Sequence, residues 1–298
     1  MNIQELTEYA STKARFSTIN GFLDLASHYL EFVSKHLQAT IVSQNEHQYQ
    51  FFQYDSWGSY QITRPINSDL FYDSEQFEHH KFAFLQTLTK ANELGDAPPE
   101  IRSMVNRMVY TAQQSIAATL DALPPGQSNK ARKINGDLFE QLMRLIFREL
   151  GIPCRSGVIN VPVIVKGEKL FNMSYQHDLI VEEDGKFKML GTIKTSSKDR
   201  LDKVFVDKFL YSRLTNTTVP HVAIILNDVQ RKKTREQNKY GINATFLPGH
   251  FKGYSLKLNP LDGVYYCDIR PNMKTDPILK DHIKTLDALI FNDVWKLV

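Results

Sequence analysis

Five short apolar runs in the second half of the chain have the length and composition of β-strands. They read GVINVPVIV, NMSYQHDLIV, KFKMLGTIK, HVAIILND and GVYYCDI, between residues 157 and 269. One helix-like run, DRLDKVFVDKFLYSRL, separates the third from the fourth. Strands interrupted by helices in this way predict an α/β (α+β) fold with a mixed central β-sheet flanked by helices.

The first part of the chain is predicted to be a mainly helical N-terminal region. Apolar residues recur with helical spacing over 22–37, and a second long helical pattern covers 101–123. Between them, the aromatic-rich stretch QYQFFQYDSWGSYQITRP is either a hairpin or a loop. Its rings are better explained by burial in a core than by stacking on bases.

A stretch of Pro, Gly and small polar residues, LPPGQSNKAR at 123–132, is the best candidate for a domain boundary. It divides the chain into regions 1–125 and 126–298. The first holds 8 Lys+Arg and 14 Asp+Glu, a net charge of −6, and the second 28 and 19, a net charge of +9. This asymmetry predicts a polyanionic partner for the second region, although unequal surface charge without a ligand is also common.

Several classes of protein do not fit the sequence. There is no apolar run of about 18 residues, which a membrane helix needs, and the segment MNIQELTEYASTKARF does not resemble a signal peptide. Cys154 and Cys267 form neither a disulfide framework nor a CxxC pair, so we expect a cytoplasmic protein. Glycine-rich phosphate loops are absent, and no nucleotide cofactor is expected.

A carboxylate and a lysine stand sixteen residues apart on two of the predicted strands. Asp178 leads into the run DLIV, and Lys194 ends the run GTIK after the turn EEDGK. A hairpin of this length can bring both side chains to one end of the sheet. A carboxylate can hold Mg²⁺, and a nearby cation can orient water or stabilise charge on a phosphodiester under attack.

One carboxylate is a poor magnesium site, and the position two residues before the lysine is Thr192 instead of an acid. The following predicted helix offers a substitute, because Arg200, Lys203 and Asp207 share one polar stripe. If the apolar side of this helix packs on the sheet, Asp207 can supply the second carboxylate. The alternative, which we weigh slightly higher on the pattern alone, is that Asp207 pairs weakly with Lys203 at the surface.

These residues resemble a known family. Asp178, then Thr192-Ile193-Lys194, then an acid thirteen residues later is similar to a permuted PD-(D/E)xK nuclease site of the EcoRII type and of enzymes that cut CCGG-containing sites. The stretch KTSSKDR is similar to the corresponding EcoRII-type segment. The helical acid of this group is usually Glu, and the EcoRII type carries Tyr at the position of Asp178. The resemblance covers roughly residues 135–210.

The resemblance implies roles for these residues. Lys194 is the expected catalytic lysine, Asp178 and Asp207 are the expected metal-binding acids, and Arg200 is expected to face the scissile phosphate. A helix predicted to begin after Asn135 carries Glu140, which supports the metal site in similar proteins and is about equally well explained as a solvated surface residue.

Further contacts to DNA phosphates are predicted from the basic residues of two segments. A solvated turn is the more common explanation for such a charge run. The residues are Lys198 in KTSSKDR, and Arg231, Lys232, Lys233 and Arg235 in QRKKTREQNK.

The resemblance implies a Mg²⁺-dependent type II restriction endonuclease that cuts double-stranded DNA and works as a homodimer. Region 126–298 is then the catalytic and DNA-binding domain, and region 1–125 serves dimerisation or regulation. Two alternatives stay open: a repair or resolvase-like nuclease of the same fold, and a DNA-binding or assembly module without catalysis.

Overall fold

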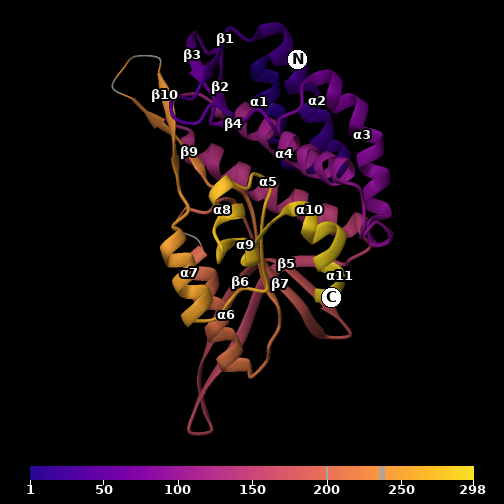
Figure 1. Cartoon of the computed structure of the whole chain (residues 1–298), viewed down its shortest axis with the longest axis vertical. Coiled ribbons are helices and arrows are strands. Elements are labelled where there is room, and N and C mark those ends of the chain that lie inside the picture. The colour runs from indigo at the N-terminus through magenta and orange to yellow at the C-terminus, as the bar shows by residue number, and fades with distance from the viewer. Residues whose placement is uncertain (199–200, 235, 237–238) are drawn as a thin grey trace. The chain divides into compact units, whose positions relative to one another are not determined.

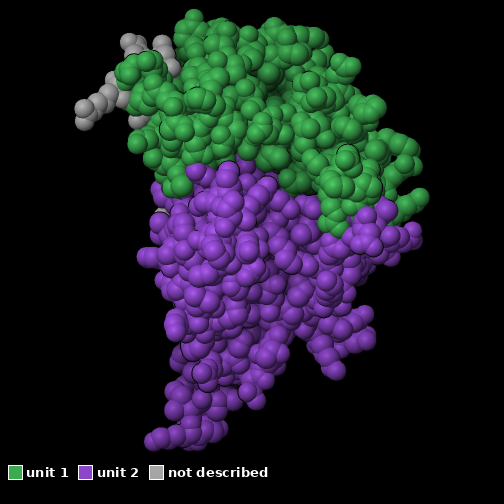
Figure 2. Space-filling model, viewed as in Figure 1, with its two compact units in different colours: residues 1–90, 97–146, 229–244 green, residues 91–96, 147–228, 245–298 purple. Residues whose placement is uncertain are grey.

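The computed structural model describes residues 1–198, 201–234, 236 and 239–298. The chain divides into two compact units, which Figure 2 shows in separate colours. Unit 1 comprises Met1–Lys90, Ala97–Ile146 and Val229–Ala244, and unit 2 comprises Ala91–Asp96, Phe147–Asp228 and Thr245–Val298. The boundary that we predicted after residue 125 therefore lies inside unit 1. The helix that follows it and a hairpin from much later in the chain both pack with the N-terminal region.

Helices form the larger part of unit 1 (Figure 1). They are α1 (Ile3–Ser11), η1 (Lys13–Phe16), α2 (Ile19–His36), α3 (Ser74–Thr89), α4 (Pro99–Asp121) and most of α5 (Ser128–Glu149). Helix α4 packs against α1, α2 and α3, and its residues from Met104 to Leu120 are almost all buried. Several of its polar side chains are buried as well, among them Gln113, which donates to Asn135 Oδ1 at 2.8 Å.

Two small antiparallel sheets complete unit 1. Strands β1 (Ala39–Val42), β2 (Tyr49–Ser56), β3 (Ser59–Ile62) and β4 (Ile66–Asn67) form one, with β2 at its centre. Strands β9 (Val229–Lys233) and β10 (Tyr240–Ala244) form the other. The aromatic-rich stretch is thus a hairpin. Four of its rings are buried, as predicted, and two of these, Tyr49 and Phe51, pack with Val229 and Ile242, whereas Trp57 and Tyr60 are exposed.

Helix α5 begins at Ser128, seven residues before the cap that the sequence suggested. Its first two turns are held by burial of Ala131 and Ile134. Asn135 is consequently a buried residue inside the helix and not its N-cap, and its amide accepts from Gln113. The predicted helix start at Asn135 was wrong because burial of Ala131 and Ile134, which precede Asn135, extends the helix towards its N-terminus.

Unit 2 is built on one mixed six-stranded sheet of order β12-β11-β8-β7-β6-β5. Strands β5, β6 and β7 are antiparallel neighbours, whereas β8, β11 and β12 run parallel to β7. Their bounds are β5 (Cys154–Val165), β6 (Glu168–Glu183), β7 (Lys186–Ser196), β8 (His221–Asn227), β11 (Gly263–Tyr266) and β12 (Ile283–Thr285). The predicted mixed sheet flanked by helices is confirmed.

Helices cover both faces of this sheet. On one face, α6 (Leu201–Thr215) and α7 (Pro248–Lys257) pack through Phe205 and Phe251 against Ile225 of β8 and Tyr266 of β11. On the other face, Tyr265 of β11 donates its hydroxyl to an acid of the C-terminal segment. The remaining elements are η2 (Ala91–Glu93), α8 (Pro271–Thr275), α9 (Leu279–His282), α10 (Leu286–Ala288), η3 (Leu289–Asp293) and α11 (Val294–Leu297).

Among the described residues, no helix combines the length and the apolar character that crossing a lipid bilayer requires.

Candidate functional site

The β6–β7 hairpin brings Asp178 and Lys194 together, as the sequence predicted. Lys194 Nζ lies 2.5 Å from Asp178 Oδ2. The same carboxylate oxygen accepts the backbone N–H of Ile193 at 2.9 Å. The regular ladder between these strands ends with the pair Leu179↔Gly191, so the Asp178 side chain takes the place of a main-chain partner where the strands separate.

Close approach of the strands at Gly191 fixes this geometry. A Cβ at that position would meet Leu179 Cβ at 3.0 Å and Leu179 Cδ2 at 3.1 Å, tighter than nearly all ordinary contacts. Glycine therefore lets β7 approach β6 closely just before Asp178 leaves the ladder. Lys194 is 26% exposed and Asp178 11%, so the pair is partly buried yet open to solvent on the lysine side.

Alternation along β7 places Lys194 on the face of the sheet that α6 covers. Leu190, four residues earlier, packs in one cluster with Tyr211 of α6, and side chains two residues apart share a face. Thr192 lies between them on that face, with Ala223 of β8 as its Cα partner. The position of the missing acid thus faces the helix that carries Asp207.

Asp207 lies on α6 and forms an ion pair with Lys203, one turn earlier. Its side chain is 19% exposed, whereas that of Lys203 is 69% exposed, so the carboxylate lies on the inner edge of the helix. Burial raises the pKa of Tyr175, and the Asp207 carboxylate raises it further. Asp207 therefore acts electrostatically on β6, three residues from Asp178. The pair with Lys203 is the alternative that the sequence left open, and a role in metal binding stays a prediction.

A cluster of four rings supports α6 beside these residues. The ring centroid of Tyr211 lies 5.7 Å from that of Tyr175, 6.4 Å from His177 and 5.4 Å from His221. Burial lowers the pKa of both His177 and His221 to about 4. His177, which adjoins Asp178 in sequence, is therefore a neutral packing residue at neutral pH.

The remaining residues of the predicted site fall in several places. Arg200 and Arg235 lie outside the described residues. Lys198 is exposed, and its backbone N–H donates to Ser196 Oγ at 3.2 Å. Glu140 lies on the part of α5 that belongs to unit 1 and is half-buried, and its place in a metal site stays a prediction.

The predicted phosphate contacts Arg231, Lys232 and Lys233 lie on β9. Arg231 donates to Ile62 O at 2.6 Å and lies 5.6 Å from the centre of the Tyr240 ring. Its guanidinium thus helps to anchor the β9–β10 hairpin on unit 1. Lys232 is exposed, and contact with DNA stays a prediction for all of these residues.

A polar edge that the sequence analysis missed follows the parallel strands. Asp228 comes directly after β8 and Asp268 two residues after β11, and both are buried, at 2% and 1% exposure. Arg270 Nε lies 3.8 Å from Asp228 Oδ1. Because β7, β8 and β11 are parallel, their carboxyl ends meet at the edge where Lys194 lies. The sequence signal for this edge was an acid soon after each apolar strand, in HVAIILND and GVYYCD.

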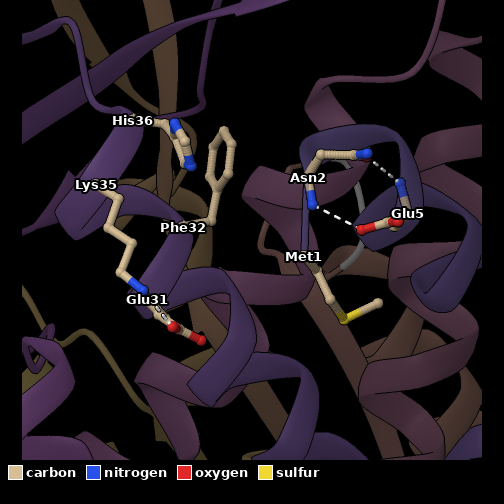
Figure 3. Close-up of a pocket in the computed structure, with 7 residues that line it drawn as sticks. All are labelled: Met1, Asn2, Glu5, Glu31, Phe32, Lys35 and His36. Carbon is tan, nitrogen blue, oxygen red and sulfur yellow. Dashed lines mark hydrogen bonds and ion pairs between the residues drawn. The ribbon is translucent and has the colours of Figure 1, made fainter.

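A hollow of about 310 Å³ in unit 1 is a weak candidate for a ligand site (Figure 3). Two of its carboxylates already have partners: Glu5 accepts from the Asn2 backbone N–H, and Glu31 accepts from Lys35. No part of the proposed chemistry depends on it.

No protein-family model matches the chain, and no curated protein matches it in sequence. Its structure is similar to the crystal structure of the Type IIP restriction endonuclease Kpn2I, with a TM-score of 0.72 and 17% identity, over 99% of this chain and 96% of the other. The fold is restriction-endonuclease-like. A complex of the restriction endonuclease PspGI with substrate DNA also aligns, with a TM-score of 0.39 and 12% identity, over 72% of this chain and 92% of the other.

Within this restriction-endonuclease-like fold, the available oxygen ligands suit Mg²⁺. That ion takes oxygen ligands and commonly uses one or two carboxylates, with water and substrate phosphate filling the other positions. Asp178 and Asp207 offer two carboxylates on facing elements. In the described part of the chain no group of three His, Cys, Asp or Glu side chains is gathered. Two carboxylates are within the number that such an ion commonly uses, and Mg²⁺ at this place stays a prediction.

Proposed function

We propose that this chain is a Mg²⁺-dependent type II restriction endonuclease that hydrolyses phosphodiester bonds of double-stranded DNA at specific sites. The observation that carries the proposal is the contact between Asp178 and Lys194 at the point where β6 and β7 separate. A restriction-endonuclease-like fold surrounds this contact, and its likeness to Kpn2I spans nearly the whole chain.

The chain's own residues have distinct tasks in this reaction. Lys194 donates to Asp178 and so fixes the orientation of that carboxylate, which the Ile193 N–H holds from the backbone. The ammonium group of Lys194 can also orient the attacking water and stabilise charge that builds on the phosphate oxygens. Mg²⁺, when bound by Asp178 and Asp207, would supply Lewis-acid stabilisation of the phosphate and lower the pKa of a bound water.

The ion pair with Lys203 does not prevent Asp207 from taking this role. An exposed lysine one helical turn away contributes only about 0.3–0.5 kcal/mol to such a pair, and Lys203 is largely exposed. A divalent cation beside Asp178 is a stronger attraction for the Asp207 carboxylate than this single, solvated charge.

Plasmid cleavage with a matched pair of lysine variants tests the proposal. We expect the wild-type protein with Mg²⁺ to give discrete bands, and Lys194→Ala to lower the cleavage rate by about 10²-fold or more, as loss of one charge-stabilising group does. Lys188 lies towards the other end of β7, at the irregularity in its pairing with β6, and pairs with Glu183. Lys188→Ala should cut at the wild-type rate.

Three outcomes would contradict parts of the proposal. Equal cleavage by Lys194→Ala and wild type would remove Lys194 from the site. Cleavage without discrete bands would favour a repair or resolvase-like nuclease of the same fold. Binding of duplex DNA without any cleavage would favour a non-catalytic DNA-binding or assembly module.

A further inference from the structure

The outer halves of β5 and β6 form a two-stranded ribbon, residues 157–177, that extends from the sheet of unit 2. Strand β5 is the last strand of that sheet, and β7 pairs with β6 only over Leu179–Glu183. Within the described part of the chain, the ribbon thus has two edges without a neighbouring strand. Figure 1 shows it as a narrow hairpin that leaves the body of the unit.

An apolar stripe runs along one face of the ribbon and continues past the helix that covers its base. Near the base, Ile159 and its Cα partner Tyr175 are buried under Tyr211 of α6. Two pairs further along, Val163 stands opposite Phe171, and Phe171 is 57% exposed. The core of unit 2 therefore extends into a surface that is open to solvent at Phe171.

Exposed apolar side chains are concentrated on this ribbon. Of the 15 large hydrophobic residues that are exposed among the described residues, five lie within these 21 positions. They are Val158, Ile164, Val165, Leu170 and Phe171. Apolar patches of this kind mark contacts with other proteins more often than chance exposure.

The charges of the ribbon favour a protein partner over DNA. Residues 157–165 and 170–177 contain no Lys, Arg, Asp or Glu, and the only such residues lie at the turn: Lys166, Glu168 and Lys169. Interfaces with DNA are strongly positive, whereas this ribbon is neutral along its length. Pro162 lacks the N–H that edge-to-edge strand pairing needs, so along β5 the contact would be made by side chains.

We infer that this ribbon forms an interface between two copies of the chain. In a two-fold contact, residue i of one copy meets residue j of the other, and j meets i. The turn is suited to such an arrangement because Glu168 and Lys169 have opposite charges. Glu168 of each copy can then face Lys169 of the other copy. The inference rests on the proposed function in one respect: cutting both strands of a symmetric site calls for two active sites.

Sedimentation velocity of the full-length protein, without DNA or Mg²⁺, tests this interface independently of cleavage. We expect the wild type to form dimers, and Phe171→Ser combined with Ile164→Ser to weaken the dimer about ten-fold or more, as loss of buried apolar anchors does. Phe82→Ser is the matched control, because Phe82 on α3 is 70% exposed and lies outside the ribbon. It should dimerise like the wild type.

A charge exchange tests the symmetry of the contact. Glu168→Lys and Lys169→Glu should each weaken the dimer, and the combined variant should restore it, because both partners are then swapped in both copies. A wild type that stays monomeric at all concentrations, or ribbon variants that dimerise normally, would overturn the inference. Ribbon variants that assemble normally but no longer bind duplex DNA would also overturn it, because the ribbon would then be a DNA contact. Variants that show only a lower melting temperature would overturn it as well, because the apolar residues would then pack within the same chain. Failure to cleave DNA would count against the proposed function and leave this interface standing.

Discussion

Lys208 is a buried charge that is held by two hydrogen bonds. Its Nζ donates to Pro260 O at 2.6 Å and to Asp262 Oδ2 at 2.7 Å. Asp262 also accepts the His221 N–H at 2.6 Å. Lys208→Ala would leave that carboxylate with one partner fewer. Because the Asp262 side chain is 32% exposed, water can compensate in part, and we expect a loss of about 2 kcal/mol in unfolding free energy.

Urea denaturation followed by circular dichroism measures this loss, and the same helix provides the control. Lys203→Ala removes a lysine that is largely exposed and should change the unfolding free energy by no more than about 0.5 kcal/mol. Equal effects of the two substitutions would show that the buried ion pair of Lys208 contributes nothing specific.

At the scale of elements, the way α6 rests on His177 and His221 makes unit 2 sensitive to acid. Burial is the main cause that lowers the pKa of each ring to about 4, and nearby lysines, Lys203 for His177 and Lys208 for His221, lower it further. Asp178 and Asp262 act in the opposite direction. In the unfolded chain a histidine has its ordinary pKa of about 6.5, so between these values the unfolded state binds protons that the folded state excludes.

Stability should therefore fall as the pH drops from about 6.5 towards 4, by on the order of 3 kcal/mol for each histidine over that range. Chemical denaturation at a series of pH values measures this dependence. His177→Asn or His221→Asn should flatten the curve in that window, whatever it does to stability at neutral pH. His250→Asn, at an exposed position on α7, should leave the curve as it is. Parallel curves for all four proteins would contradict the prediction.

At the scale of the whole molecule, the charge asymmetry of the sequence disappears once the chain is divided by its units. Unit 1 holds 17 Lys+Arg and 15 Asp+Glu, a net charge of +2, and unit 2 holds 19 and 18, a net charge of +1. The basic run of the β9–β10 hairpin belongs to unit 1, which accounts for about half of this change. Net charge therefore no longer assigns a polyanion to one region, and contact with DNA must be tested residue by residue.

Lys232 is the best residue for that test because it is exposed on β9. Lys232→Ala should weaken binding of duplex DNA regardless of sequence, and it should reduce the slope of log K against log salt by about 1. Fluorescence anisotropy over a range of salt concentrations measures both quantities. Lys252 on α7, which pairs with Asp276 at 2.8 Å, is the control. Lys252→Ala should leave the slope unchanged. An unchanged slope for Lys232→Ala would exclude a phosphate contact there.

The sequence was sufficient where the interactions are local. Asp178 and Lys194 could be placed together because a single tight turn joins their strands. The acids Asp228 and Asp268 could not be assigned to the same edge, since parallel pairing of β8 and β11 joins segments about forty residues apart. Nothing in the run QRKKTREQNK indicates that the strands beside it pack with Tyr49, far earlier in the chain. Non-local packing of this kind is decided by the whole fold and leaves little local signal.

The β9–β10 hairpin has a consequence for how the protein is made. Unit 1 is completed by Val229 and Ile242, which pack with Tyr49 and Phe51. During translation these residues leave the ribosome only after four strands of the sheet of unit 2 and one helix have been synthesised, namely β5, β6, β7, α6 and β8. At about 5–20 residues per second, the roughly 190 residues from Phe51 to Ile242 take about 10–40 s to synthesise. Strand β2 waits for that time with part of its core uncovered. A nascent chain released before residue 244 would thus display those aromatic rings, which makes it a natural client for chaperones.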